Sequence, residues 1–105
     1  MTEFATIRRW TLNEGADESA LLALVREKMI PAYKQAPGCL RQHLFRVPGD
    51  RSYVALTFWD SKASADGWAG AAGAPWREQH RETIARWLEL MSFREELDAE
   101  VVVSS

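Results

Sequence analysis

Three things are scarce in this 105-residue sequence: cysteine, an excess of positive charge, and long apolar runs. The single cysteine, Cys39, cannot form a disulfide within the chain, and this fits a reducing compartment. The formal net charge of -2, with both signs mixed along the chain, offers no cationic surface for a nucleic-acid backbone. No apolar run approaches the roughly 20 residues of a membrane span. We therefore expect neither a nucleic-acid nor a membrane partner.

The N-terminal residues Met1-Thr2-Glu3-Phe4 lack the basic start and apolar run of a signal peptide. Together with the lone cysteine, this predicts a cytoplasmic protein. The content of 47% hydrophobic and 27% charged residues is that of an ordinary soluble globule, and the length fits one domain covering residues 1–105.

The first half of the chain alternates between strand and helix patterns. The segment from Phe4 to Leu12 is rich in β-branched and aromatic residues and predicts a strand. Asp17 can cap a following helix, in which Pro31 removes one backbone donor and predicts a kink or an early end. The helical stripe recurs every four residues, at Leu21, Val25, Met29 and Tyr33. Pro37-Gly38 stops the helix, and the segments 40–47 and 52–59 then predict an antiparallel hairpin.

The second half predicts a helix in two pieces and a last strand. Asp60 or Ser61 can cap a short helix, which the glycines at 67, 70 and 73 should loosen or turn into a lid. Pro75 suits the start of a second piece, whose apolar stripe runs through Trp76, His80, Ile84, Trp87 or Leu88, and Met91. Residues 97–103 alternate apolar with acidic positions and predict the strand. The order βαββαβ predicts an α+β ferredoxin-like fold with a four-stranded antiparallel sheet.

Both faces of the predicted sheet carry large apolar groups. In the strand 52–59, for example, Val54, Leu56 and Phe58 alternate with Tyr53 and Trp59. Helices can cover one face, and no further element is left for the other. A second copy of the chain is the economical cover, because two-fold pairing is the commonest symmetry of oligomers. We therefore expect a homodimer.

Several short motifs together resemble one family. They are Val54-Ala55-Leu56-Thr57-Phe58-Trp59-Asp60-Ser61, a following alanine-rich helix with Trp68, then His80, and Pro37-Gly38-Cys39-Leu40 before the second strand. Over nearly the whole chain, the sequence resembles the antibiotic biosynthesis monooxygenase family of dimeric α+β barrels. That family includes cofactor-independent oxygenases of quinol-like aromatic polyketides, haem-degrading monooxygenases and members of unknown activity.

The haem-degrading branch of that family uses an asparagine on the first strand, a tryptophan on the second helix and a histidine beyond it. By resemblance Trp68 and His80 match the last two, and Arg8 occupies the asparagine position. Arginine only donates hydrogen bonds and carries a fixed charge, so it does not replace an asparagine. The resemblance therefore favours the cofactor-free branch, with no tightly bound cofactor. Haem binding or degradation, and a non-catalytic dimer that holds a small ligand, remain the alternatives.

Oxygenation without a cofactor requires a donor or cation facing the substrate oxyanion and aromatic walls that exclude water. We predict His80 and Arg8 as catalytic residues, His80 because histidine is the residue type suited to proton transfer near neutral pH and because it lies on the apolar stripe. The chain has five tryptophans, too many to bury fully in so small a core. The residues predicted to bind a small aromatic substrate are Trp68, Trp76, Trp10, Trp59 and Arg41.

A metal site is not expected. Cys39 and His43 lie four positions apart along a predicted strand, which separates them by about 13 Å. Ligands of one ion must each lie about 2 to 2.3 Å from it, so the two cannot share one. The sequence also has no phosphate-binding loop, dinucleotide fingerprint or Ser-His-Asp triad motif.

Overall fold

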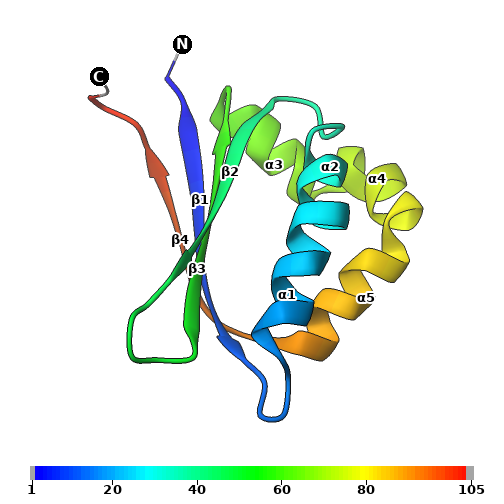
Figure 1. Ribbon diagram of the computed structural model, residues 1–105. Coiled ribbons are helices and arrows are strands. Elements are labelled where there is room, and N and C mark those ends of the chain that lie inside the picture. The colour runs from blue at the N-terminus through cyan, green and yellow to red at the C-terminus, as the bar shows by residue number, and fades with distance from the viewer. Residues whose placement is uncertain (1, 104–105) are drawn as a thin grey trace.

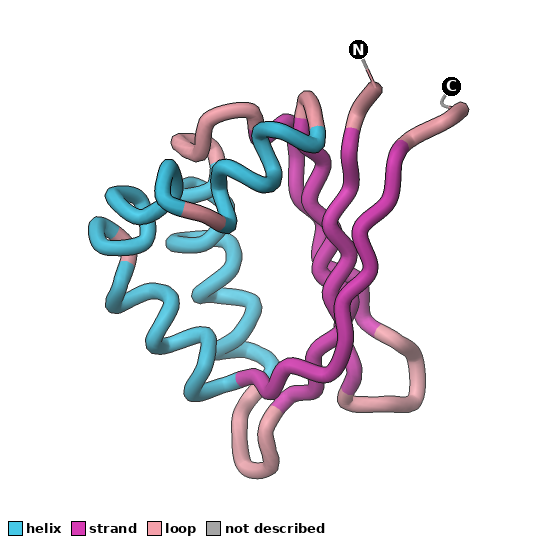
Figure 2. The backbone as a smooth tube through the Cα atoms, turned by 180° about the vertical axis from the view of Figure 1, so that it is seen from behind, coloured by secondary structure: helices cyan, strands magenta, loops and turns pink. Residues whose placement is uncertain are grey.

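A four-stranded antiparallel sheet carries its helices on one face, as the computed structural model of residues 2–103 shows (Figure 1). The strand order is β2-β3-β1-β4. The strands are β1 (Phe4–Leu12), β2 (Cys39–Arg46), β3 (Ser52–Trp59) and β4 (Met91–Glu100). This arrangement confirms the predicted α+β ferredoxin-like class. Seen from behind, the opposite face of the sheet has no helix over it (Figure 2).

The helical layer has two parts, one from each crossover between strands. The first is α1 (Glu18–Leu24), a π-helical turn η1 (Val25–Met29) and α2 (Ile30–Tyr33). The second is α3 (Lys62–Ala69), a 3-10 turn η2 (Ala71–Gly73), α4 (Ala74–Gln79) and α5 (Arg81–Leu90). Asp17 caps α1 as predicted, because its side chain accepts a hydrogen bond from the backbone N of Ser19.

Pro31 explains the π-helical turn in the first part. Without an N–H, Pro31 cannot bond to the carbonyl four residues earlier, and the helix adjusts by widening one turn. The backbone N of Ile30 accordingly donates to the carbonyl of Val25, five residues back. The predicted interruption therefore takes the form of a wider turn, and the chain remains helical to Tyr33.

The predicted limits of the last helix and the last strand were wrong. The single stripe from Pro75 to Met91 is broken at His80, whose φ of -108° and ψ of 24° separate α4 from α5. Met91 is the first residue of β4, which starts six positions earlier than predicted and ends at Glu100. The start of β4 alternates as Met91, Ser92, Phe93 and Arg94, but Glu95 interrupts the alternation at the register shift with β1, and Met91 also fits the helical stripe.

Two buried clusters lie at opposite ends of the space between sheet and helices. One contains Phe4, Ala32, Ala36, Trp59, Ala65 and Trp76. The other contains Leu12, Leu21, Tyr53, Trp87, Leu90 and Met91. Phe4 and Leu12 begin and end β1 on its helix-facing side, so Arg8 lies midway between the two clusters.

Candidate functional site

A pocket of about 200 Å³ lies between the sheet and the helices. Its floor comes from three strands through Arg8, Trp10, Gln42, Leu44, Ala55 and Thr57. Its helical wall includes Met29, Tyr33, Trp68, Trp76, Ile84 and Trp87. The π-helical turn contributes Val25 and Met29 to this wall, so the irregular turn that Pro31 imposes lies over the pocket.

Three aromatic side chains pack against one another in the wall. The ring centroids of Trp68 and Trp76 are 4.0 Å apart in an edge-to-face arrangement. Tyr33 lies 5.3 Å from Trp68 and 5.1 Å from Trp76 between ring centroids. The indole N of Trp76 donates to the carbonyl of Ala32 at 2.7 Å, which fixes the ring. Burial raises the pKa of Tyr33 above its ordinary value, so its phenol stays protonated and able to donate at neutral pH.

Arg8 brings a positive charge to the floor of the pocket. Its Nε donates to an Oε of Glu96 at 3.1 Å across the β1–β4 pair. In the part of the chain that the structure describes, Glu96 is the one acceptor of the Arg8 guanidinium. The two terminal nitrogens of Arg8 are thus available to a ligand, and Glu96 holds the group in place.

A second polar pair, Gln42 of β2 and Thr57 of β3, lies on the β2 side of the floor. The side-chain N of Gln42 donates to Oγ1 of Thr57 at 3.2 Å. Thr57 is buried and Gln42 half-buried. Neither carries a charge, so this side of the pocket offers only uncharged hydrogen-bonding groups.

Arg77 holds the roof of the pocket. Its terminal nitrogens donate to the backbone carbonyls of Trp68, at 2.5 Å, and of Gly70, at 2.8 Å. A side chain at Gly73 would collide with the Trp68 carbonyl and with Arg77 itself. The turn between α3 and α4 therefore depends on a close backbone approach, and it positions Trp68.

Four of the seven predicted site residues line the pocket together: Arg8, Trp10, Trp68 and Trp76. Trp59 lies instead in the core, where it is 1% exposed and its indole N donates to Oγ1 of Thr6 at 3.3 Å. Arg41 lies on the bare face, with its guanidinium carbon 3.9 Å from the centre of the Phe58 ring. A register shift in β2 between Cys39 and Arg41 determines which face Arg41 occupies.

His80 is not among the residues that line the pocket. It lies between α4 and α5, behind the wall, with its ring centroid 4.6 Å from that of Trp76. One ring nitrogen is 3.2 Å from the side-chain oxygen of Gln35. His80 can thus act on the pocket through Trp76, and its catalytic role stays a prediction.

Sequence reasoning missed Tyr33, Gln42, Thr57 and Arg77 as pocket residues. Tyr33 lies on the predicted helical stripe, and such a stripe does not distinguish a pocket residue from a core residue. The two-residue period of β3 places Thr57 on the same side as Tyr53 and Trp59, and this signal was present in the sequence. Arg77 gave no signal, because its role depends on the backbone path of another segment.

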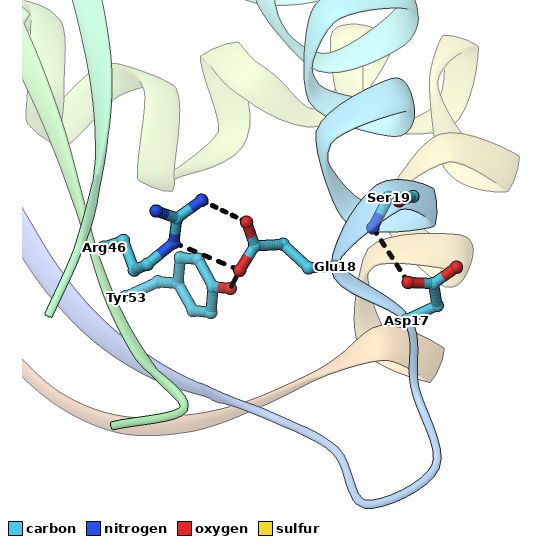
Figure 3. A network of polar contacts seen from close by, with 5 residues as sticks. All are labelled: Asp17, Glu18, Ser19, Arg46 and Tyr53. Atoms are coloured by element: carbon cyan, nitrogen blue, oxygen red, sulfur yellow. Dashed lines mark hydrogen bonds and ion pairs between the residues drawn. The ribbon is translucent and has the colours of Figure 1, made fainter. Parts of the chain in front are cut away.

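A polar network ties the first helix to the hairpin at one end of the sheet (Figure 3). Arg46 and the Tyr53 hydroxyl both donate to the Glu18 carboxylate, Arg46 through Nε at 3.1 Å and also through a terminal nitrogen. These hydrogen bonds, first that of Arg46 and then that of Tyr53, lower the pKa of Glu18 below its ordinary value. The network fixes the distance between α1 and the β2–β3 hairpin.

Within residues 2–103, no helix is both long and apolar enough to cross a membrane. No three His, Cys, Asp or Glu side chains of those residues group closely enough to hold a metal ion.

The fold and the site define a ferredoxin-like α+β protein with an aromatic pocket between its sheet and its helices. The antibiotic biosynthesis monooxygenase family model matches residues 4–86, and the chain belongs to that family. No curated protein matches the chain in sequence.

Solved structures with the same fold cover nearly the whole chain. SnoaB, a cofactor-independent oxygenase from Streptomyces nogalater, is 14% identical, with a TM-score of 0.68 over 100% of this chain and 96% of its own. The haem degrader MhuD from Mycobacterium tuberculosis is 22% identical, with a TM-score of 0.74 over 97% and 98%. HapK from Hahella chejuensis is 16% identical, with a TM-score of 0.76 over 97% and 95%. At these identities the structures establish the fold alone.

Proposed function

We propose that the protein is a monooxygenase that oxidises a small aromatic or quinol-like substrate in this pocket without a tightly bound cofactor. One observation carries the proposal: of the two guanidinium groups that line this aromatic pocket, that of Arg8 has no protein acceptor for its terminal nitrogens among the described residues, whereas Arg77 uses both of its own on backbone carbonyls. The similarity to SnoaB, described as a cofactor-independent oxygenase, supports the same reaction class.

The size of the pocket limits the substrate. Pockets for drug-sized ligands measure roughly 300–1,000 Å³, whereas this one measures about 200 Å³. A molecule of one or two fused rings therefore fits the space better than a large polycyclic one. Edge-to-face indoles offer flat apolar surfaces to such rings.

Arg8 supports the chemistry by favouring the anion of the substrate. A cation within hydrogen-bond distance lowers the pKa of a phenol, so that the phenolate forms more readily. The electron-rich anion can then pass an electron to dioxygen in a space from which the aromatic wall excludes water. In the balanced reaction, one atom of O2 is inserted at a ring C–H position and the other leaves as water with two hydrogens of the substrate, so that a phenol gives a quinone and a quinol gives a hydroxyquinone, with the substrate as the sole reductant.

The residues present do not fit a haem. A histidine that ligates haem iron needs a free ring nitrogen aimed into the pocket. His80 lies behind Trp76 and is paired with Gln35. His43 borders the pocket, but its side chain is exposed and its ring lies against Phe45 and Phe58, on the bare side of the sheet. The similarity to MhuD concerns the fold and does not supply this missing ligand.

Oxygen uptake with a panel of quinols and one- or two-ring phenols tests the proposal. We expect turnover by the wild type and a loss of about 100-fold in kcat/KM in Arg8→Met, typical of removing an oxyanion donor. His80→Ala should lower kcat less, through a displaced Trp76, and His80→Gln should restore part of it. No turnover with any member of the panel would contradict the proposal. A Soret shift on adding haem would favour the haem-binding alternative.

We also propose that a second copy of the chain covers the bare face of the sheet. The centre of this face is apolar, with Ile7 of β1 opposite Leu56 of β3 and with Phe58 beside them. Phe45 is 50% exposed and Leu97 is 64% exposed at its margins. Apolar patches of this kind on one face are typical of interfaces between copies.

A further inference from the structure

We infer that the pocket selects aromatics with two oxygens on opposite edges of the ring, an ionised one at Arg8 and a neutral hydroxyl at Gln42 and Thr57. The inference deepens the proposed function and rests on it for the nature of the reaction. Gln42 is then a specificity-determining residue.

The strand register places the two polar groups on opposite sides of an open floor. Arg8 lies opposite Ala55, and Gln42 lies opposite Thr57, two positions further along the same face of β3. Because adjacent strands are about 4.8 Å apart and each residue advances about 3.4 Å, the backbone positions of Arg8 and Gln42 are about 12 Å apart. The side chain between them is the methyl group of Ala55, which leaves room for a flat ring.

The two sides of the floor differ in charge. Glu96 takes only Nε of Arg8, so the terminal nitrogens can form two charge-assisted hydrogen bonds to an anionic oxygen. At the other side, Gln42 uses one N–H on Thr57 and keeps its carbonyl oxygen as an acceptor. Gln42 also keeps its second N–H, so this uncharged side suits a hydroxyl that both donates and accepts, whereas an anionic oxygen is bound more strongly by the charge of Arg8. The bound molecule therefore has a preferred direction.

The walls determine how the ring lies between these groups. Trp68 and Trp76 meet edge to face over the pocket, and the Trp76 ring is fixed by its bond to Ala32. Arg77 anchors Trp68 through the carbonyls of Trp68 and Gly70. A rigid wall reduces the number of orientations that the ring can adopt, so one bound ring can form hydrogen bonds at both ends of the floor at the same time.

Calorimetric titration under nitrogen tests the inference with two matched probes, 1,4-dihydroxynaphthalene and 1-naphthol. We expect the wild type to bind the diol about tenfold more tightly, as one additional neutral hydrogen bond provides. Gln42→Leu should remove this difference by weakening the diol alone. Arg8→Met should weaken both probes alike. Thr57→Val is a second variant of the same pair and should weaken the diol by less than Gln42→Leu.

The inference is overturned if the wild type binds the two probes equally or binds neither, or if Gln42→Leu weakens both to the same extent. Since oxygen is absent, these outcomes are independent of turnover. Selective binding without oxygen uptake in air would contradict the proposed function and leave the inference standing. Turnover without a preference for the diol would contradict the inference and leave the proposed function standing.

Discussion

The two faces of the sheet have the same strands and nearly the same apolar content, yet they differ in where their charges lie. On the helix-covered face the charge is central, because Arg8 lies at the middle of β1. On the bare face the centre is Ile7 and Leu56, and ion pairs such as Arg9 with Glu95, 2.8 Å apart, lie beside it. A central charge among aromatics suits a ligand, whereas an apolar centre with a charged border suits a protein surface.

The largest effect should come from the covered face. Trp59→Ala should reduce the free energy of unfolding by about 3–5 kcal/mol, as expected for removing a fully buried tryptophan. Trp68→Ala is the matched control, since Trp68 is half-buried and borders the pocket. Trp68→Ala should lower the unfolding free energy less than Trp59→Ala does, and it should weaken ligand binding more. Urea unfolding measures the stability of both variants. Equal losses of stability would contradict the assignment of Trp59 to the core and Trp68 to the site.

On the bare face, a single charge should separate the proposed dimer. Leu56→Glu places a carboxylate at the centre of that face, and burying it unpaired is costly. The dissociation constant should rise on the order of 100-fold or more, as at the centre of other interfaces. Sedimentation velocity checks this, with the exposed Ala85→Glu on α5 as the control. If the wild type sediments as a stable single subunit at micromolar concentration, a second copy of the chain does not cover the bare face.

Much of this contrast could be predicted from the sequence. The alternation in β3 identified two apolar faces, and the β-branched and aromatic run from Phe4 to Leu12 identified β1 to the residue. The start of β4 was missed because Met91 also fits the helical stripe, and because Glu95 interrupts the alternation of Met91 and Phe93 with Leu97 at the register shift with β1. Glu96 pairs with Arg8 across the strands, a relation between positions 88 residues apart that no local pattern reveals.

The candidate site was predicted in part for the same reason. A tryptophan can be recognised as a wall in the sequence, but its depth depends on the packing around it: Trp59 is buried at one end of the sheet, whereas Trp68 reaches the pocket. The predicted stripe put His80 on one helix face with Trp76 and Ile84, but the helix breaks at His80 itself. The break between α4 and α5 then placed its ring behind Trp76. Helical periodicity cannot predict such a break, since no proline or glycine lies at that position.

Glycine substitutions distinguish a flexible roof from a rigid one. If the second helical part is rigid, Gly73→Ala should destabilise the protein and lower ligand affinity, because its Cβ would collide with the Trp68 carbonyl. Gly67→Ala is the control, since its nearest contact would be Ala72 Cβ at 3.7 Å. Within α3 it should stabilise by about 0.5–1 kcal/mol. A mobile lid would instead tolerate both substitutions, and thermal unfolding with a ligand titration checks this.

The smallest effect should come from the Glu18 network, which joins α1 to the β2–β3 hairpin at one end of the covered face. Because Arg46 and Tyr53 lower the pKa of Glu18 from its ordinary value of 4.5, folding favours the carboxylate. The contribution to stability is present above pH 4.5 and is lost as the pH falls through the lower folded pKa.

Glu18→Gln lacks this titration. The difference in unfolding free energy between wild type and Glu18→Gln should therefore be constant near neutral pH and shrink on acidification. Other carboxylates titrate in both proteins and cancel in the difference. A difference that stays constant down to pH 3 would mean that the network does not hold Glu18 ionised, and that the end of the covered face is closed by the packing of Leu21 and Tyr53 alone.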